Sequence, residues 1–228
     1  MPIAILGSEN DFPDPGQADA EGLVAIGGDL GPERLLAAYR AGIFPWYSDG
    51  QPILWFSPDP RMLLYPERFK CSKSLERVLK SDRYEVRIDT RFEAVIKACA
   101  ATPRAGQEGT WITEDMIEAY LELHRMGIAH SFETYRNGEL VGGLYGLSLG
   151  AAFFGESMYH HSPDASKRAF ARLVEFANER DFRFIDAQTP SAHLQRLGAE
   201  RVSRSDFLTQ LEDALASDSL IGSWAAFA

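Results

Sequence analysis

The sequence predicts an α+β fold in which helices pack on a mainly antiparallel sheet. The central segment AHSFETYRNGELVGGLYGLSLGAAFFGESMY alternates in the manner of strands. It contains Asn137-Gly138, a dipeptide typical of two-residue hairpin turns. Patterns typical of helices precede this segment, and a helix, a strand and two further helices follow it.

The first 60 residues are rich in Gly and Pro and contain few strand-like runs. Within them, GGDLGPERLLAAYRAGIFPW predicts one helix, because Pro32 suits a first turn and Gly42 suits the end. Leu35, Leu36 and Tyr39 form its apolar stripe. The next segment, FPWYSDGQPILWFSPDPR, carries four prolines and predicts a loop.

Three helices and one strand are expected before the central segment. CSKSLERVLKSD predicts a helix that begins after Ser72 or Ser74, RYEVRID a strand, and RFEAVIKACAA a second helix. After the loop TPRAGQEGT, the segment WITEDMIEAYLELHRMG predicts a helix between Thr113 and Gly127.

The central segment predicts three antiparallel strands, and SPDASKRAFARLVEFANERD then predicts a long amphipathic helix. The core face of this helix holds Phe170, Leu173, Val174 and Ala177. FRFIDAQ predicts a strand, and SAHLQRLG and SRSDFLTQLEDAL predict two helices, the second capped by Ser203. The long helix is therefore a β-α-β crossover, which places the ends of its two strands near each other. The tail after Ser217 is expected to be weakly ordered.

The bulk properties are those of an ordinary globular chain. It has 228 residues, of which 45% are hydrophobic and 25% charged, enough for one large domain or two small ones. No stretch approaches the roughly 18 apolar residues of a membrane span, and the N-terminus lacks the basic region of a signal peptide. Cys71 and Cys99 show no pairing pattern, so reduced thiols in a cytoplasmic protein are expected. The net charge of −10 excludes a basic footprint over the whole domain.

Three polar residues stand at the ends of the two strands that the crossover joins. Glu156 lies among apolar residues in FFGESMYHH, where a carboxylate is costly unless it is paired or used. Asp186 and Gln188 are two residues apart, so they share one face of their strand, with Ala187 on the other. Each residue also has a simpler interpretation. Glu156 could face water on an edge strand, and Asp186 could cap the next helix. Convergence of the three groups makes this place the best candidate site.

Two further features point to nucleic acid, although each has a simpler interpretation. Trp46, Tyr47, Trp55, Phe56 and Trp111 are either packed under a long loop or form a stacking platform for a base. Residues 68–87 hold seven basic and three acidic residues, a local charge of +4. Lys73, Arg77 and Lys80 share one helix face there, which is either a solvated surface or a phosphate contact.

Motifs for metal, nucleotide and serine-hydrolase chemistry are absent from the sequence. No set of Cys, His and carboxylates has zinc spacing, and GLYGLSLG is no nucleotide fingerprint. There is no G-x-S-x-G elbow.

Several long motifs, in order, resemble those of the leucyl/phenylalanyl-tRNA–protein transferase family. They are EGLVAIGGDLGPERLLAAYRAGIFPW, PILWFSPDPR, EGTWIT, GELVGGLYG, FFGESM, DASK and FIDAQ. The resemblance covers about residues 10 to 215. It implies a GCN5-related acetyltransferase-like core over residues 63–228, with a small N-terminal α/β domain over residues 1–62.

The resemblance also implies an activity. Such an enzyme moves Leu, Phe or Met from aminoacyl-tRNA to the α-amino group of a protein with N-terminal Arg or Lys, which marks that protein for N-end-rule degradation. It implies no cofactor, metal or ATP. A cytoplasmic monomer without a membrane partner is expected.

Site residues follow from the same motifs. Asp186 and Gln188 are implied as the catalytic pair, Asp186 holding the amine or polarising Gln188, and Glu156 as the residue that holds the donor's α-amino group. The implied pocket for the donor's side chain consists of Leu144, Phe153, Gly155, Met158, Phe170, Leu173 and Ile185. Trp46 and Trp111 are implied to meet the 3′ adenosine of the tRNA. Lys73, Arg77 and Lys80 are implied to contact the tRNA backbone.

The chain departs from the family pattern at two places. Ala187 stands where the family usually has Cys, and His160-His161 where it commonly has Ser-Arg. Two other functions stay open. An N-acetyltransferase that uses acetyl-CoA would need a pyrophosphate loop, for which QRLGAE is the nearest candidate. A non-catalytic tRNA-binding module would need the aromatic and basic residues but not Glu156, Asp186 and Gln188 together.

Overall fold

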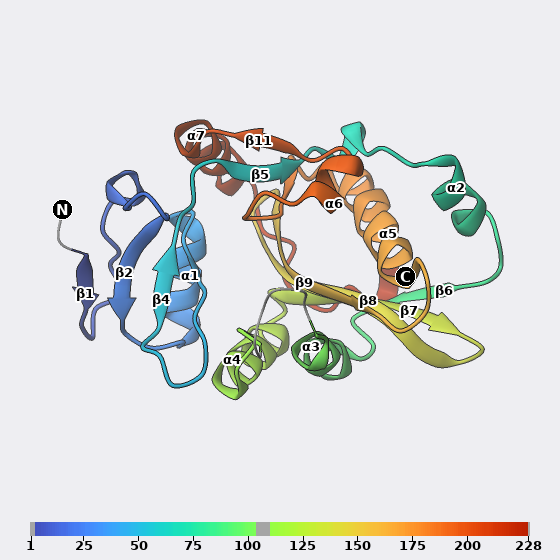
Figure 1. The fold of residues 1–228 in the computed structure, drawn as a ribbon, viewed down its shortest axis with the longest axis horizontal. Coiled ribbons are helices and arrows are strands. Elements are labelled where there is room, and N and C mark those ends of the chain that lie inside the picture. The colour runs from blue at the N-terminus through green and yellow to red at the C-terminus, as the bar shows by residue number, and fades with distance from the viewer. Residues whose placement is uncertain (1–2, 104–109, 228) are drawn as a thin grey trace.

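The structure is a computed structural model that describes residues 3–103 and 110–227. Its strands form two sheets (Figure 1). The smaller sheet has the order β1-β2-β4-β3, built from β1 (Ala4–Leu6), β2 (Leu23–Gly27), β4 (Leu54–Phe56) and β3 (Phe44–Pro45). Helix α1 (Pro32–Arg40) lies beside this sheet, as Figure 1 shows in blue.

The strands of the N-terminal part correct two expectations from the sequence. Few strands were expected in the first 60 residues, and residues 44–61 were expected to form a loop, but β3 and β4 pair there in antiparallel fashion. Each strand of this sheet is only two to five residues long. Strands so short leave almost no alternation to recognise, and the prolines around them suggest a loop.

The larger sheet has seven strands in the order β11-β5-β10-β9-β8-β7-β6. The strands are β5 (Arg61–Leu64), β6 (Glu85–Ile88), β7 (Ala129–Arg136), β8 (Glu139–Leu149), β9 (Ala152–His160), β10 (Phe184–Asp186) and β11 (Glu200–Val202). Among the described strands of this larger sheet, only β9 and β10 pair in parallel. The mainly antiparallel α+β fold is thus confirmed, while β5 and β11 were not predicted.

All seven helices that the sequence predicts are present. Those after α1 are α2 (Lys73–Leu79), α3 (Phe92–Ala101), α4 (Glu114–Arg125), α5 (Ala165–Glu179), α6 (Ala192–Arg196) and α7 (Arg204–Leu215). The predicted serine and threonine caps Ser72, Thr113 and Ser203 each accept a backbone N–H. Short 3₁₀ helices lie at Pro15–Gln17, Pro66–Arg68 and Ala225–Phe227.

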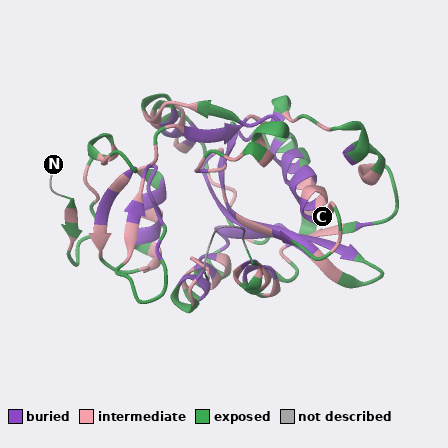
Figure 2. Ribbon diagram, viewed as in Figure 1, coloured by how far each residue is buried: buried purple, intermediate pink, exposed green. Residues whose placement is uncertain are grey.

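The larger sheet is covered on both faces, so its central strands are mostly buried, whereas the edge strands β6 and β11 are largely exposed or half-buried (Figure 2). Helices α3 and α4 lie on one face and α5 on the other (Figure 1). The first core cluster includes Tyr39, Tyr120 and Phe154, and the second includes Leu144, Phe153 and Ile185. Helix α5 joins parallel β9 and β10 as the predicted crossover and brings Glu156 beside the end of β10.

A β-bulge interrupts the pairing of β8 and β9. Tyr145 pairs with Ser157 and Gly146 with Gly155, so Glu156 is the extra residue. A Cβ atom on Gly146 would lie 2.1 Å from the carbonyl oxygen of Phe154, so only glycine fits there. The bulge lifts Glu156 out of the regular alternation of its strand.

The tail after Ser217 was expected to be weakly ordered, and this expectation is wrong. Trp224 is buried in the second core cluster. Its ring stacks on His130, and its backbone N–H donates to Asp89 Oδ2 at 2.8 Å. A single tryptophan carries enough apolar surface to fix a short segment.

None of the described helices is long and apolar enough to cross a membrane.

Candidate active site

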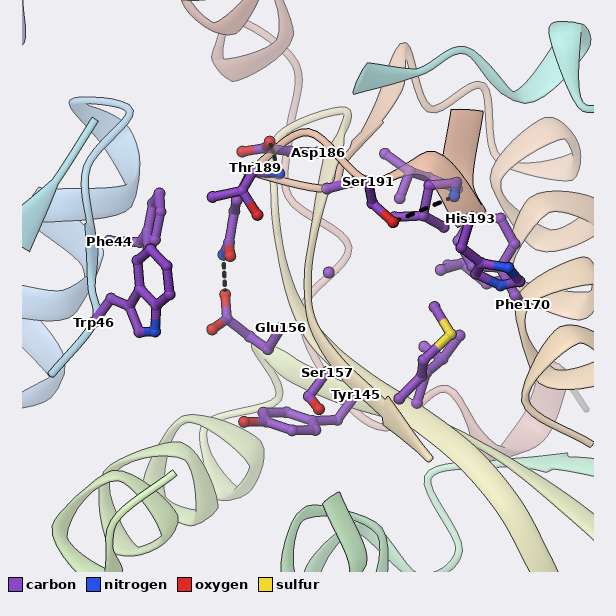
Figure 3. A pocket seen from close by; sticks show the side chains of 18 of the residues that line it. Phe44, Trp46, Tyr145, Glu156, Ser157, Phe170, Asp186, Thr189, Ser191 and His193 are labelled. Carbon is purple, nitrogen blue, oxygen red and sulfur yellow. Dashed lines mark hydrogen bonds between the residues drawn. The ribbon is translucent and has the colours of Figure 1, made fainter. Parts of the chain in front are cut away.

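A cavity of about 410 Å³ opens between the middle of β9 and the end of β10, a size typical of small-molecule sites. Glu156 therefore lies within its strand and not at the strand end that the sequence suggested. The smaller sheet and α1 lie on one side of it, and α5 and α6 on the other (Figure 3). Glu156, Asp186 and Gln188 all line it, so the structure brings together the three polar residues that the sequence singled out.

Glu156 is buried and accepts three hydrogen bonds. Tyr39 Oη and Gln188 Nε2 both donate to Oε1 at 2.7 Å, and Tyr120 Oη donates to Oε2 at 3.2 Å. The dashed line at Glu156 in Figure 3 marks its bond with Gln188. The edge-strand interpretation of Glu156 is wrong, because β9 lies between β8 and β10 and only 8% of Glu156 is exposed.

The environment of Glu156 favours its protonated form. Burial raises the pKa of Glu156 from 4.5 to about 7, although the hydrogen bonds from Tyr39, Tyr120 and Gln188 act against the shift. Burial also raises the pKa of Tyr39 and of Tyr120 well above 10. Both phenols therefore keep their protons and remain donors to Glu156.

Asp186 is fully buried and forms an ion pair with Arg61, which is fully buried too. Arg61 Nη2 donates to Oδ2 at 2.7 Å, and Arg61 Nε donates to Oδ1 and Oδ2 at 3.0 and 3.1 Å. A further donor of Arg61 reaches the carbonyl of Gly42 at 3.1 Å, and the guanidinium lies over the ring of Phe207. Asp186 does not cap the next helix, since Ser191 does so.

Gln188 begins the turn that leaves β10. Its φ of 61° is in the left-handed region, and its backbone N–H donates to Asp186 Oδ1 at 2.8 Å. The side chains of Asp186 and Gln188 bond with Arg61 and Glu156, on the side of the first core cluster, while Ala187 packs against the second. The two side chains thus lie on the same side, as predicted, but Gln188 lies beyond the end of β10 and does not belong to the strand.

The apolar part of the cavity contains six of the seven residues proposed for a side-chain pocket. They are Leu144, Gly155, Met158, Phe170, Leu173 and Ile185, which together form the apolar wall of the cavity. The seventh, Phe153, does not line the cavity, which corrects that prediction. Its ring is fully buried behind the wall, edge-on to Phe132 and tilted against Trp224. The side chains of Ala152, Phe153 and Phe154 alternate between the two faces of the sheet in β9. Alternation alone does not show which side chains line the cavity and which are buried behind the apolar wall.

Both predicted tryptophans stand at the cavity. Trp46 is 44% exposed and meets Phe56 edge-on, so it is not simply packed under a loop. Trp111 is half-buried. The preceding Glu108 and Gly109, and most of the predicted loop TPRAGQEGT, lie outside the described residues.

The predicted basic helix face does not line the cavity. Lys73 and Arg77 are exposed on α2, and Lys80 is exposed at its C-cap. This helix packs against α5 at a distance from the site (Figure 1). Their contact with a tRNA backbone stays a prediction.

Sequence reasoning missed the partners of the three polar residues. Tyr39 was assigned only to an apolar stripe, and nothing set Tyr120 apart from other helix residues. Arg61 ends the motif PILWFSPDPR, but a β-strand at that position was not foreseen. His193 lines the cavity from α6 and is labelled beside Phe170 in Figure 3.

The arrangement suits a cationic or amine ligand beside an apolar group. Glu156 offers a carboxylate, Gln188 a carboxamide, and the adjacent wall accepts a hydrophobic side chain. Within residues 3–103 and 110–227, no three His, Cys, Asp or Glu side chains are grouped so that they could hold a metal ion.

Comparisons with known proteins agree on one family. A family model described as leucyl/phenylalanyl-tRNA protein transferase matches residues 63–212, and the model of that family's N-terminal domain matches residues 28–59. A leucyl/phenylalanyl-tRNA–protein transferase of Solidesulfovibrio magneticus is 53% identical over 224 residues, 98% of this chain and 91% of the relative. One of Anaeromyxobacter sp. is 54% identical over 224 residues, 98% and 95% of the two chains.

Among solved structures, a ribosomal-protein-alanine N-acetyltransferase of Brucella melitensis biovar Abortus 2308 is similar with a TM-score of 0.35 and 17% identity. The similarity covers 48% of this chain and 81% of that one.

Proposed function

The chain belongs to the leucyl/phenylalanyl-tRNA–protein transferase family, and from this premise we propose how its cavity carries out the transfer. The enzyme is an aminoacyltransferase that moves leucine or phenylalanine from aminoacyl-tRNA to a protein with N-terminal Arg or Lys. The transfer marks the acceptor for N-end-rule degradation. The single observation that supports the placement of the reaction is the 2.7 Å bond between Glu156 and Gln188 beside an apolar wall.

The reaction needs little acid–base power, because the donor is already an activated ester. The acceptor's neutral α-amine attacks the ester carbonyl carbon, so a C–N bond forms and the C–O bond to the terminal ribose breaks. The amine loses a proton, and the departing ribose oxygen gains one. Holding the two reactants in line contributes the larger part of the acceleration.

Glu156 holds the α-ammonium group of the donor amino acid. The carboxylate is already fixed by Tyr39, Tyr120 and Gln188, so it does not have to be ordered when the donor binds. A bound ammonium group favours the ionised carboxylate and offsets the burial that disfavours it.

Gln188 positions the attacking amine, and Asp186 positions Gln188. Because Gln188 Nε2 donates to Glu156, its carbonyl oxygen is left to accept a hydrogen bond from the amine. The Asp186 carboxylate is occupied by Arg61 and by the backbone N–H of Gln188. A carboxylate with these partners acts through the conformation of Gln188 rather than as the group that takes the proton.

The donor's side chain enters the apolar part of the cavity between β9, β10 and α5. Burial of a Leu or Phe side chain there contributes roughly 1.5–3 kcal/mol. Methionine has a similar volume and flexible geometry, so we include it among the donors. Trp46 and Trp111 stack on the terminal adenosine, and Lys73, Arg77 and Lys80 on α2 contact the tRNA backbone.

We also propose features of the whole enzyme. The acceptor is cationic, and the net charge of −10 favours its approach. The enzyme is expected to act as a monomer, as the sequence analysis assumed. The cytoplasm is its location, since aminoacyl-tRNA is used there. The chain divides into residues 1–62 and 63–228, although β5 (Arg61–Leu64) pairs within the larger sheet.

A transfer assay tests the proposed site. The protein is mixed with tRNA carrying labelled Phe and with a peptide that begins with Arg, and label on the peptide is measured. We expect Gln188→Ala and Glu156→Gln to lower kcat/KM by roughly 100-fold or more. The exposed α4 residue Glu118 provides a matched control, and Glu118→Gln should leave the rate unchanged.

Two outcomes would contradict this proposal. Wild-type rates in both Gln188→Ala and Glu156→Gln would show that the transfer reaction takes place outside this cavity. Transfer of an acetyl group from labelled acetyl-CoA, in place of the amino acid, would favour an N-acetyltransferase.

A further inference from the structure

The C-terminal tail is anchored behind the apolar wall of the cavity. Trp224 is 1% exposed, and its Nε1 donates to the carbonyl of Leu220 at 3.0 Å. At the chain end, the carbonyl of Phe227 accepts a bond from Arg172 Nη2 on α5 at 2.8 Å. The tail is thus fixed to the same helix that carries Phe170 and Leu173.

Trp224 contacts both elements that form the wall. Its ring stacks on Phe176 of α5 with a centroid distance of 4.5 Å. It also lies 6.3 Å from the ring of Phe153 on β9. Phe153 pairs in register with Ile185, which lines the cavity, and Phe176 is three residues beyond Leu173 on α5. The indole is therefore inserted between the helix side and the strand side of the wall.

We propose that Trp224 is a positioning residue that sets the width of the donor side-chain pocket and thereby the preference between Leu and Phe. This inference rests on the proposed function of the cavity and names a residue that selects its substrate. Trp224 itself touches no substrate and acts through Phe153 and Phe176. Protein interiors are close-packed, so the volume behind a wall determines how far that wall can yield.

The direction of the effect follows from the packing. A smaller residue at position 224 leaves volume into which Phe153 and Phe176 relax, so the wall retreats and the pocket widens. A wider pocket loses contact with the smaller Leu side chain more than with Phe. One methylene in a hydrophobic pocket changes kcat/KM by about 10-fold or more, so small shifts of the wall are measurable.

The experiment compares both donors in the full-length protein. Leu-tRNA and Phe-tRNA are tested separately with one Arg peptide, using wild type, Trp224→Phe and Trp224→Leu. We expect the ratio of kcat/KM for Phe to that for Leu to rise by about threefold or more in Trp224→Leu, with a smaller rise in Trp224→Phe. Trp224→Phe keeps an aromatic ring and serves as the test if Trp224→Leu does not fold.

Ile96→Ala is the matched control, because Ile96 is fully buried on α3, outside the second core cluster and the cavity lining. It should lower the unfolding temperature without changing the donor ratio. An unchanged ratio in both Trp224 variants, with activity falling only as stability falls, would overturn the inference. A wild-type protein that transfers neither donor would overturn the proposed function, and the inference with it.

Discussion

Protons at Glu156 are shared among a carboxyl group and two phenols. Tyr39 and Tyr120 each bond to Glu156, and the two hydroxyls bond to each other. Burial gives this carboxyl a pKa of about 7, so the cluster holds either two or three protons near neutral pH.

The raised pKa of Glu156 makes stability depend on pH. The folded protein holds this proton more tightly than the unfolded chain, so the free energy of unfolding decreases as pH rises from about 4.5 to about 7. Relative to Glu156→Gln, the wild type should lose up to about 3 kcal/mol over this window. Urea denaturation of both proteins between pH 4.5 and 8 measures the difference. Parallel pH profiles would show that Glu156 does not carry this proton.

The free energy of unfolding should depend strongly on both partners of the buried ion pair between Arg61 and Asp186. Arg61→Met leaves a buried carboxylate unpaired and should lower the free energy of unfolding by about 3–5 kcal/mol. Arg61→Met combined with Asp186→Asn should cost less than the two single changes added together, because no uncompensated charge remains.

An exposed ion pair provides the control for that cycle. Arg68 and Glu200 are about half exposed, so Arg68→Met should cost less than about 1 kcal/mol by the same measurement. Strict additivity of Arg61→Met and Asp186→Asn would contradict a direct interaction between them.

At the residue scale, the sequence predicted polar residues of the cavity but not what holds them. Glu156, Asp186 and Gln188 were singled out because the two strands joined by the crossover were expected to bring their polar groups together. Arg61 and Tyr39 come from segments more than 90 residues away along the chain. Only the tertiary fold brings them to the site, and no local pattern marks a tyrosine as the donor to a distant carboxyl group.

At the scale of elements, a side chain at Gly146 should disrupt the bulge between β8 and β9. A Cβ atom there would lie 2.1 Å from the carbonyl oxygen of Phe154, which belongs to backbone and cannot rotate away. Gly146→Ala should therefore cost roughly 3 kcal/mol of stability and reduce transfer, since Glu156 is the bulged residue.

A glycine in open space separates this effect from the general cost of a methyl group. Gly7 has no atom within 4 Å of an added Cβ, so Gly7→Ala should change stability by less than about 0.5 kcal/mol. Thermal unfolding and the transfer assay measure both variants. Normal transfer by Gly146→Ala would show that the bulge does not position Glu156.

Long elements were predictable because each repeats its signal several times. Helix α5 shows its apolar stripe over four turns, and β7 to β9 are eight or more residues long with a marked turn between the first two. Strands β5 and β11, of four and three residues, have no such repetition. Their pairing with each other, and that of β5 with β10, is decided by the rest of the sheet.

At the scale of the whole molecule, the basic face of α2 stands apart from the cavity, although the protein is acidic. A tRNA is long enough to reach both, so its backbone can contact α2 while its terminal adenosine enters the site. Charges that contact phosphates release counterions, and their loss weakens the salt dependence of binding. Loss of these charges is therefore expected to weaken tRNA binding without changing the rate of the chemical step.

Replacing Lys73, Arg77 and Lys80 by Gln should raise KM for aminoacyl-tRNA and leave kcat nearly unchanged. The slope of log binding constant against log salt should decrease by about 2–3, because each phosphate contact contributes about 0.7–0.9. This slope is measured by filter binding of uncharged tRNA at salt concentrations from about 50 to about 300 mM.

A second triple variant tests whether position or merely charge matters. The matched positions are Arg40, Arg183 and Arg201, which are exposed on α1, before β10 and on β11. Replacing them by Gln changes the net charge by the same amount but should leave the salt slope close to that of wild type. Equal slopes in the two triple variants would mean that the tRNA responds to the overall charge of the protein, and the contact assigned to α2 would have to be abandoned.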